Sequence, residues 1–126
     1  MATPEVSIVI PSFNHPDLTL RCLDSIERAK DATSREIIVV DDASTDPGVE
    51  AVARRPGIIF LRKEVNEGYT HTANHGARHA RGRYLFFLNN DTEVTDGYLE
   101  WLLDIFRRFP KAGAVGCKLI YPDGTL

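Results

Sequence analysis

The sequence predicts an α/β fold in which a mostly parallel sheet carries helices on both faces. Five short apolar runs, at residues 6–10, 37–40, 58–61, 84–88 and 114–120, alternate with segments of helical periodicity or turn chemistry. The runs are continuously apolar, as expected of strands buried on both sides. Strands that alternate with helices along a chain usually pair in parallel. The length of 126 residues suits a single domain.

The first two helices are each predicted to begin at a proline. Pro11 is predicted to end the first strand, and Pro16 then suits the first turn of a helix. Apolar residues recur in this helix at helical spacing, at Leu18, Cys22, Ile26 and Ala29. Asp46 and Pro47 follow the second strand and are typical of a cap and a first-turn proline. They predict a second, short helix.

The third helix is predicted to present a face of small residues, thin enough to pack closely on the sheet. These residues are Ala73, Ala77 and Ala80. A cap at Thr95 or Asp96 is predicted to open the fourth helix, which Pro110 ends. Its apolar positions are Leu99, Leu102, Leu103 and Phe106. Trp101, beside them, is expected to pack.

Composition and charge disfavour several classes of protein. The net charge is −3 with no long run of either sign, whereas nonspecific binding to nucleic acid needs a basic face. No nucleic acid partner is therefore expected. No apolar stretch approaches the roughly 18 residues of a membrane span. No basic segment followed by an apolar one opens the chain, so no signal peptide is expected.

The two cysteines are predicted to be buried free thiols in a reducing compartment. Cys22 and Cys117 are far apart and have no C-x-x-C spacing. We therefore expect a cytoplasmic protein, or one at the inner face of a membrane as part of a longer chain. The turn sequence at residues 122–124 is followed by two residues only. We therefore expect the chain to be part of a longer protein.

Distinctive residues, most of them polar, follow three of the predicted strands. They are Pro11, Ser12, Phe13 and Asn14 after the first strand, Asp41, Asp42, Ala43, Ser44, Thr45 and Asp46 after the second, and Asn89, Asn90, Asp91, Thr92 and Glu93 after the fourth. The carboxyl ends of parallel strands lie along one edge of the sheet, where such folds bind their ligands. We expect these groups to converge on one crevice.

The residue types suggest a chemistry for this crevice. An aspartate at a strand end can accept a hydrogen bond from a ring N–H of a pyrimidine base, which discriminates against ligands without that donor. Asp91 is a hard oxygen ligand suited to Mg²⁺ or Mn²⁺. Such an ion can bridge two phosphates and neutralise charge as a diphosphate departs. Asn89 and Asn90 add amide groups without adding charge.

Each motif taken alone is also consistent with a purely structural role. The Asp-Asp-x-Ser-x-Asp segment suits a turn or a cap, and the segments at Asn66 and Asn74 suit turns or close packing. His71, His75 and His79 recur at helical spacing and could chelate a transition metal. Without a nearby carboxylate or cysteine pattern, they favour a solvated helix face.

The order of four motifs is more specific than any one of them. The segments VSIVIPSFNHPDLTLRCLDSI, EIIVVDDASTD, NEGYTHTANHGARHARGRYLFFLNNDTEV and GAVGCKLIYPDGTL occur in this order. Together they resemble the family 2 glycosyltransferases of the GT-A fold, especially bacterial rhamnosyltransferase-like members. The resemblance covers residues 5–126. It implies a nucleotide-diphospho-sugar donor and a role in polysaccharide or cell-wall glycan biosynthesis.

The resemblance also implies roles for the residues that bind the nucleotide. Pro11, Ser12 and Phe13 match the family loop that lies against the base. Asp42 matches the aspartate that hydrogen-bonds the base, and Asp41 is its neighbour. Three further residues match the segment near the nucleoside and the sugar, namely Asn66, Gly68 and Asn74.

The metal and diphosphate roles follow from the same resemblance. Asn89, Asn90 and Asp91 match the D-x-D region, with Asp91 as the expected ligand of Mg²⁺ or Mn²⁺ and the two asparagines near the sugar and diphosphate. The first acidic position of that motif is Asn89 here, so the literal motif with its two carboxylates is absent.

The resemblance implies that residues 1–126 form the donor-binding part of the transferase domain. The general base, which would deprotonate an acceptor hydroxyl during inverting transfer from a UDP- or dTDP-linked sugar, is expected beyond residue 126. The acceptor, a glycan or a lipid-linked glycan, would be bound by the full-length protein. Alone, this chain is expected to bind nucleotide without transfer and to self-associate through exposed sheet edge and apolar surface.

Three rival interpretations remain at this point. A non-catalytic nucleotide-sugar-binding or assembly domain would share the same fold. A phosphoryl-acceptor signalling domain would use a set such as Asp41, Asp42, Asp91 and Lys118, but its acidic pair would follow the first strand and not the second. A dinucleotide-binding module would need a G-x-G-x-x-G segment after the first strand, where the sequence has Pro-Ser-Phe-Asn.

Overall fold

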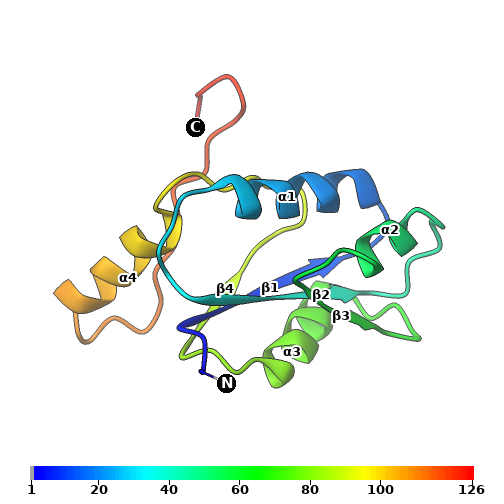
Figure 1. Ribbon diagram of the computed structural model, residues 1–126, viewed down its shortest axis with the longest axis horizontal. Helices are drawn as coiled ribbons and strands as arrows, with labels where there is room; N and C mark the ends of the chain where they lie inside the picture. The colour runs from blue at the N-terminus through cyan, green and yellow to red at the C-terminus, as the bar shows by residue number, and fades with distance from the viewer. Residues whose placement is uncertain (1) are drawn as a thin grey trace.

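Four parallel strands form the centre of the molecule. The computed structural model describes residues 2–126 of the chain. The strands are β1 (Val6–Ser12), β2 (Arg35–Asp41), β3 (Ile59–Arg62) and β4 (Tyr84–Phe87). They lie in the order β3-β2-β1-β4, and every neighbouring pair is parallel (Figure 1). All four carboxyl ends therefore lie along one edge of the sheet.

Helices cover both faces of the sheet. The helices are α1 (Pro16–Arg28), α2 (Val49–Ala53), α3 (Tyr69–His79) and α4 (Tyr98–Arg108). Figure 1 shows α1 and α2 on one face and α3 on the other. Helix α4 lies beside β4, where Phe106 stacks on Tyr84 with ring centroids 5.0 Å apart. The predicted fold class, a parallel sheet with helices on both faces, is confirmed.

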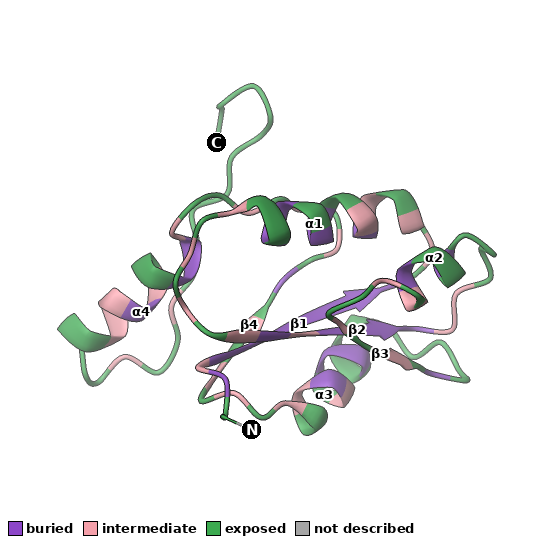
Figure 2. Ribbon diagram, viewed as in Figure 1, coloured by how far each residue is buried: buried purple, intermediate pink, exposed green. Residues whose placement is uncertain are grey.

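The central strands are buried on both sides, as their continuous apolar sequences predict. Ile8 and Ile10 of β1 pack with Cys22 and Ile26 of α1 in the larger core cluster. Val9 points to the opposite face, in a smaller cluster beneath α3. The buried residues concentrate in β1, β2 and the inner faces of the helices, whereas the C-terminal segment is exposed (Figure 2). The core therefore holds the carboxyl ends of β1 and β2 in place.

Helix α3 approaches the sheet closely because Gly76 faces it. A Cβ atom built on Gly76 would lie 2.5 Å from Val9 Cγ1 and 2.8 Å from Val40 Cγ2. Ala73, one turn earlier, is buried on the same side. Of the predicted small residues, Ala73 is buried, whereas Ala77 and Ala80 are half-buried and Ala80 lies just after the helix. The closest contact is made by Gly76, which was not part of the predicted face. This packing determines where the N-terminal end of α3 meets the strand ends.

A buried carboxylate holds the turn between α3 and β4. Glu36 of β2 accepts hydrogen bonds from Ser7 Oγ at 2.6 Å and from the Arg81 backbone N–H at 2.7 Å. The Arg81 guanidinium also pairs with it at 3.0 Å. Burial alone would raise the pKa of Glu36, but these donors outweigh that effect and hold it below its ordinary value.

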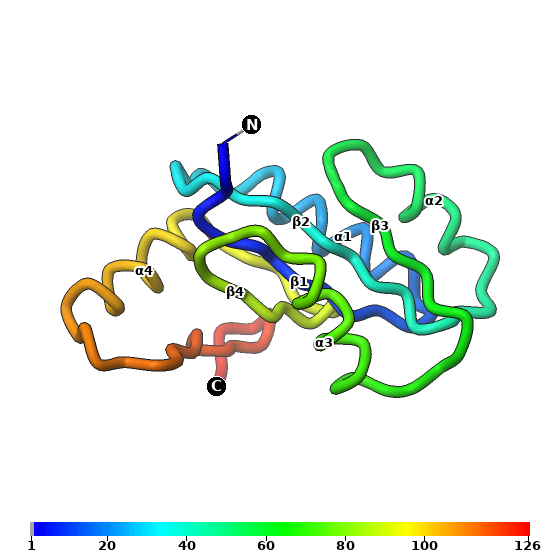
Figure 3. The backbone as a smooth tube through the Cα atoms, turned by 90° about the horizontal axis from the view of Figure 1, so that it is seen from below, coloured from blue at the N-terminus to red at the C-terminus, as the bar shows by residue number. Residues whose placement is uncertain are grey.

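The predicted fifth strand is wrong. Residues 114–120 form no regular secondary structure in the described chain and are mostly exposed. Their sequence has strand character, but a strand needs a partner for its backbone groups, and this segment does not join the β-ladder at β4. In Figure 3 the segment passes on the outer side of β4. An apolar groove of about 690 Å³ separates the two.

Two expectations about single residues in this region are also wrong. Cys117 is exposed because the segment around it does not pack, whereas Cys22 is buried as predicted, and both thiols are free. Trp101 is 71% exposed, because it lies on the outer face of α4.

The start of α4 differs from the prediction. Neither Thr95 nor Asp96 caps the helix. The residue before the helix is Gly97, whose backbone is in the left-handed conformation. Asp31, from the loop after α1, accepts the backbone N–H groups of Leu99 (2.8 Å) and Glu100 (3.2 Å). The cap is thus supplied by a residue distant in the sequence.

Among residues 2–126, no helix combines the length and apolar character needed to cross a bilayer.

Gly76→Ala is expected to lower the free energy of unfolding. The added methyl group would meet two stiff, fully buried valines, and overpacking of this kind costs about 1–3 kcal/mol. The helix propensity of alanine offsets up to about 1 kcal/mol of that cost. Chemical denaturation followed by circular dichroism would measure the difference.

Thr70→Ala, at an exposed position of the same helix, is the matched control and should change stability little. A Gly76→Ala protein as stable as the wild type would show that α3 can move away from the sheet without loss.

Candidate functional site

A cavity of about 390 Å³ lies at the carboxyl edge of the sheet. It is lined by Pro11, Ser12, Phe13, Asp42, Asn66, Gly68, Tyr69, Thr72 and Asn90. These residues come from the ends of β1 and β2, the start of α3 and the loop after β4. The structure therefore brings together seven residues that the sequence analysis selected, from four separate segments. Tyr69 and Thr72 were not selected.

Asp42 lies buried at the base of this cavity, with 4% of its surface exposed. Its Oδ1 accepts hydrogen bonds from Lys63 Nζ and from the Glu67 backbone N–H, both at 3.0 Å. Its Oδ2 accepts the Gly68 backbone N–H at 2.9 Å. Burial alone would raise the pKa of Asp42, but these donors hold it below its ordinary value. The group is a fixed, ionised hydrogen-bond acceptor.

The loops after β1 and β2 are tied to one another. Asn14 Oδ1 accepts the backbone N–H groups of Thr45 (2.9 Å) and Asp46 (3.0 Å), and the Asn14 N–H donates to Ser44 Oγ at 2.7 Å. Asn14 and Ala43 both have positive φ, at 53° and 60°. Asparagine adopts this conformation readily, whereas alanine holds it at an energetic cost that the surrounding contacts must offset. The hydrogen bonds of Asn14 thus hold the two loops beside the cavity together.

Asp41 occupies a different environment from its neighbour. It is buried and accepts hydrogen bonds from the backbone N–H of Ser44 at 3.1 Å and from the Ser44 hydroxyl. Arg62 Nε lies 3.8 Å from its Oδ2. Asp41 does not line the cavity. Its contacts fix the turn that presents Asp42.

Two aromatic side chains border the cavity. Phe13 follows β1 and is 45% exposed, and Tyr69 opens α3 and is also exposed. Exposed aromatic rings beside a polar floor suit a flat ligand, because a ring can stack on them. Phe13 was selected from the sequence, whereas Tyr69 lies next to Gly68 and carries no separate signal.

Helix α1 anchors the loop that follows β4. The Asn90 amide donates to Thr19 Oγ1 at 3.1 Å, and the Val94 N–H donates to Ser25 Oγ at 3.0 Å. Between them, the Cys22 thiol lies 3.8 Å from the Asn89 carbonyl oxygen. Burial raises the pKa of Cys22 to about 12, so the thiol is neutral. In Figure 1 this loop rises from the sheet to α1.

Apart from Glu93, which pairs with Arg28, the loop offers one carboxylate and one amide oxygen to a cation. Asp91 is exposed and lies outside the cavity lining, whereas its neighbour Asn90 is part of that lining. Because Thr19 engages the amide nitrogen of Asn90, its carbonyl oxygen is the group available to a ligand. Mg²⁺ is usually held by one or two carboxylates and completed by substrate phosphates. This donor set fits an ion of that kind. Asn89 and Asn74 lie outside the cavity lining.

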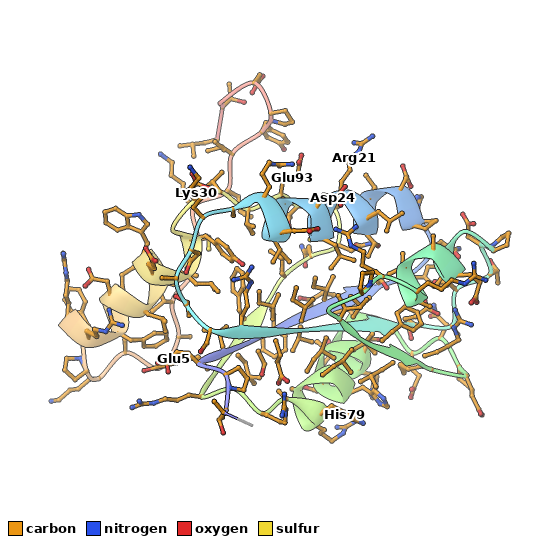
Figure 4. All side chains as sticks on the ribbon, viewed as in Figure 1. Glu5, Arg21, Asp24, Lys30, His79 and Glu93 are labelled. Carbon is orange, nitrogen blue, oxygen red and sulfur yellow. The ribbon has the colours of Figure 1, made fainter. Side chains whose placement is uncertain are left out.

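The histidines of α3 lie mostly at the surface. His71 and His79 are exposed, and Figure 4 shows His79 at the outer side of α3, whereas His75 is half-buried. Within the described part of the chain, no three His, Cys, Asp or Glu side chains group closely enough to hold a metal ion. His71 and His79 therefore lie on a solvated face of the helix, as the sequence analysis favoured for the three histidines.

Comparison with curated proteins finds relatives that are much longer than this chain. The O-antigen biosynthesis protein RfbC of Myxococcus xanthus is 37% identical over 98% of this chain, which covers 10% of that protein. The poly(ribitol-phosphate) beta-glucosyltransferase of Bacillus spizizenii is 31% identical over 77% of the chain, which covers 16% of that protein. The chain thus spans a small part of the length of these relatives.

Comparison with solved structures gives the same fold. The crystal structure of S. aureus TarS 1-349 aligns with a TM-score of 0.71 and 20% sequence identity, over 91% of this chain and 38% of the other. TarS has the GT-A glycosyltransferase fold, which this chain therefore shares. The model of glycosyl transferase family 2 matches residues 7–126, nearly the whole chain. The chain belongs to glycosyl transferase family 2.

Proposed function

We propose that this chain is the donor-binding part of a transferase that uses a nucleotide-diphosphate sugar. The observation that carries the proposal is the buried, ionised Asp42 at the base of a 390 Å³ cavity bordered by aromatic rings. Family membership sets aside the phosphoryl-acceptor and dinucleotide interpretations. A domain that only binds nucleotide sugars would use the same cavity.

Asp42 and Phe13 would recognise the base. An ionised carboxylate accepts hydrogen bonds and donates none, so it suits the N3–H of uracil or thymine. Phe13 is exposed enough for a base to stack on its ring. A UDP- or dTDP-linked sugar is therefore the donor that this geometry favours. Pro11, Ser12, Asn66 and Gly68 would surround the nucleoside.

The diphosphate would lie toward the loop after β4. Asn90 and Asp91 would hold Mg²⁺ or Mn²⁺ together with the donor's phosphates, and Thr19 and Ser25 keep this loop against α1. When bound, the ion would neutralise the charge of the departing diphosphate. Asn90 would orient the phosphates and the sugar through its free carbonyl oxygen.

The whole protein would transfer the sugar to an acceptor hydroxyl with inversion, in bacterial polysaccharide or cell-wall glycan synthesis at the cytoplasmic side of a membrane. One relative is named as an O-antigen biosynthesis protein and another as a poly(ribitol-phosphate) beta-glucosyltransferase, and these names support this class of acceptor. The general base would lie outside residues 1–126. This chain alone is expected to transfer no sugar, and measurable transfer to any acceptor would refute that.

Self-association of this chain stays a prediction. Leu85 and Phe87 on the outermost strand β4 are about half exposed, beside the apolar groove. Apolar side chains on an unpaired sheet edge favour pairing with another chain. A strictly monomeric mass in light scattering would contradict this prediction.

Phe13→Ala is expected to weaken UDP binding by about tenfold or more. Loss of a stacked aromatic ring costs about 1–3 kcal/mol per base, and Phe13 is exposed, so the fold should be retained. Isothermal titration calorimetry with UDP would measure the dissociation constants of the wild type and the variant.

Phe109→Ala is the matched control, because Phe109 is 62% exposed and lies outside the cavity lining. It should leave UDP binding unchanged. A wild-type protein that is folded and does not bind UDP, or an equal effect of both substitutions, would overturn the proposed base site.

Asp91→Ala is expected to remove the gain in UDP affinity that Mn²⁺ provides. The reason is that Asp91 is the carboxylate that the loop offers to an ion beside the diphosphate. Titrations with and without Mn²⁺ would give the ratio of affinities, which should fall to about one in the variant.

Glu93→Gln serves as the control in the same loop, because Glu93 pairs with Arg28 of α1 at 3.5 Å. It should retain the Mn²⁺ effect. Retention of that effect in Asp91→Ala would assign the ion to other groups.

A further inference from the structure

An ion pair is buried directly beneath the cavity. Lys63 follows β3, and 6% of its side chain is exposed. Its Nζ lies 3.0 Å from Asp42 Oδ1, 2.9 Å from Glu67 Oε1 and 3.3 Å from Thr72 Oγ1. Burial alone would lower the pKa of Lys63, but its hydrogen bonds to Glu67 and Asp42 raise it above its ordinary value. The amine is therefore charged at neutral pH.

The bonding of Asp42 leaves part of its carboxylate for a ligand. Oδ1 is engaged by Lys63 and by the Glu67 N–H, whereas Oδ2 receives the Gly68 N–H. The Thr72 hydroxyl, which donates to the Gly68 carbonyl oxygen at 2.7 Å, also lies close to the carboxylate and helps to lower its pKa. A carboxylate has about four acceptor positions. Because Asp42 lines the cavity, the remaining position on Oδ2 is the one that a ligand N–H can use. Lys63 donates to Oδ1 and thereby helps to fix the orientation of the Asp42 carboxylate plane.

The charge state of Asp42 decides which base it can bind. An ionised carboxylate is an acceptor only, and it pairs with the N3–H of uracil. The N3 atom of cytosine has no hydrogen at neutral pH and would face the carboxylate with a lone pair. A protonated carboxyl group could donate to cytosine N3 and would lose its preference for uracil. A cation that keeps Asp42 ionised therefore maintains the preference for uracil over cytosine.

We propose that Lys63 is a positioning residue that sets the base preference of this site, because it holds the Asp42 carboxylate in one orientation and in its ionised form. The proposal rests on the proposed function, in which Asp42 receives the base. Lys63 would act through Asp42 without touching the ligand, since it is absent from the cavity lining.

The other charged groups around Asp42 do not replace Lys63. Glu67 bears the opposite charge and contacts Lys63 itself, and Asp41 is engaged by Ser44. Arg62 extends to Glu50 at 2.7 Å and toward Asp41. On α3, His71 and His75 interact electrostatically with Glu67. The pKa of His75 is lowered, mainly by burial and then by neighbouring cationic groups. Lys63 is the cation in contact with Asp42.

The test compares wild-type protein with Lys63→Met, which keeps an unbranched side chain shorter by one atom and removes its charge. UDP and CDP are titrated by calorimetry between pH 8 and pH 5.5, a range in which cytosine N3 stays unprotonated. The wild type should prefer UDP throughout, with a ratio that does not depend on pH. Removing the cation raises the pKa of Asp42, so the protonated fraction grows as the pH falls.

In Lys63→Met, the UDP affinity should therefore decrease toward pH 5.5, and the ratio of UDP to CDP affinity should fall by about tenfold. A purely structural role would weaken both nucleotides together and leave the ratio and its pH profile unchanged. That result would overturn the proposal. Lys111→Met, at an exposed position outside the cavity, is the matched control and should behave as the wild type.

A measurement on the wild type covers the case in which Lys63→Met does not fold. The carbon-13 resonance of the Asp42 carboxyl group should show a titration midpoint below the ordinary value of about 3.9. A midpoint at or above that value would overturn the proposal. If the folded wild type binds no UDP, the proposed function fails as well, whereas UDP binding that is unaffected by Lys63→Met overturns the role of Lys63 alone.

Discussion

The carboxylate of Asp42 is the contact on which the functional edge of this fold depends. It joins three segments, because it directly follows β2, pairs with the lysine after β3 and accepts the two N–H groups that precede α3. Each donor lies in the loop that connects β3 to α3. A buried charge is stable only when its partners are in place. The same pairing that stabilises this corner also keeps the group ionised for a ligand.

The close packing of α3 on the face of the sheet opposite to α1 and α2 determines the geometry of that contact. Gly76 lets α3 approach Val9 and Val40, and the direction of the helix then places Gly68 over Asp42. A larger residue at position 76 would shift the helix away from the sheet and lengthen these hydrogen bonds. The position of the charged site is thus determined by an apolar contact two turns further along the helix.

Much of this arrangement could be predicted from the sequence, because it depends on local patterns. Continuous apolar runs predicted the four observed strands, and parallel pairing then predicted that the residues after β1, β2 and β4 meet. Lys63 escaped notice because it lies in an Arg-Lys-Glu segment typical of surface charge. The cap of α4 was missed because Asp31 precedes Leu99 by 68 residues. The segment 114–120 has strand propensity, but propensity supplies no partner, and so the fifth strand was predicted wrongly.

The two ends of the candidate site are built differently, and this bears on what the chain can do alone. The side chain and the carbonyl group of Asp42 are held by Lys63 and by residues 66–68, and its backbone N–H donates to the Ser12 carbonyl oxygen at 2.8 Å, so all of these contacts lie within this chain. The diphosphate end consists of an exposed Asp91 and an asparagine held by a single helix contact. An ion there would draw further ligands from the donor's own phosphates. In the proposed function, base recognition would therefore be a property of the folded chain itself, whereas metal binding and diphosphate binding would depend on one another.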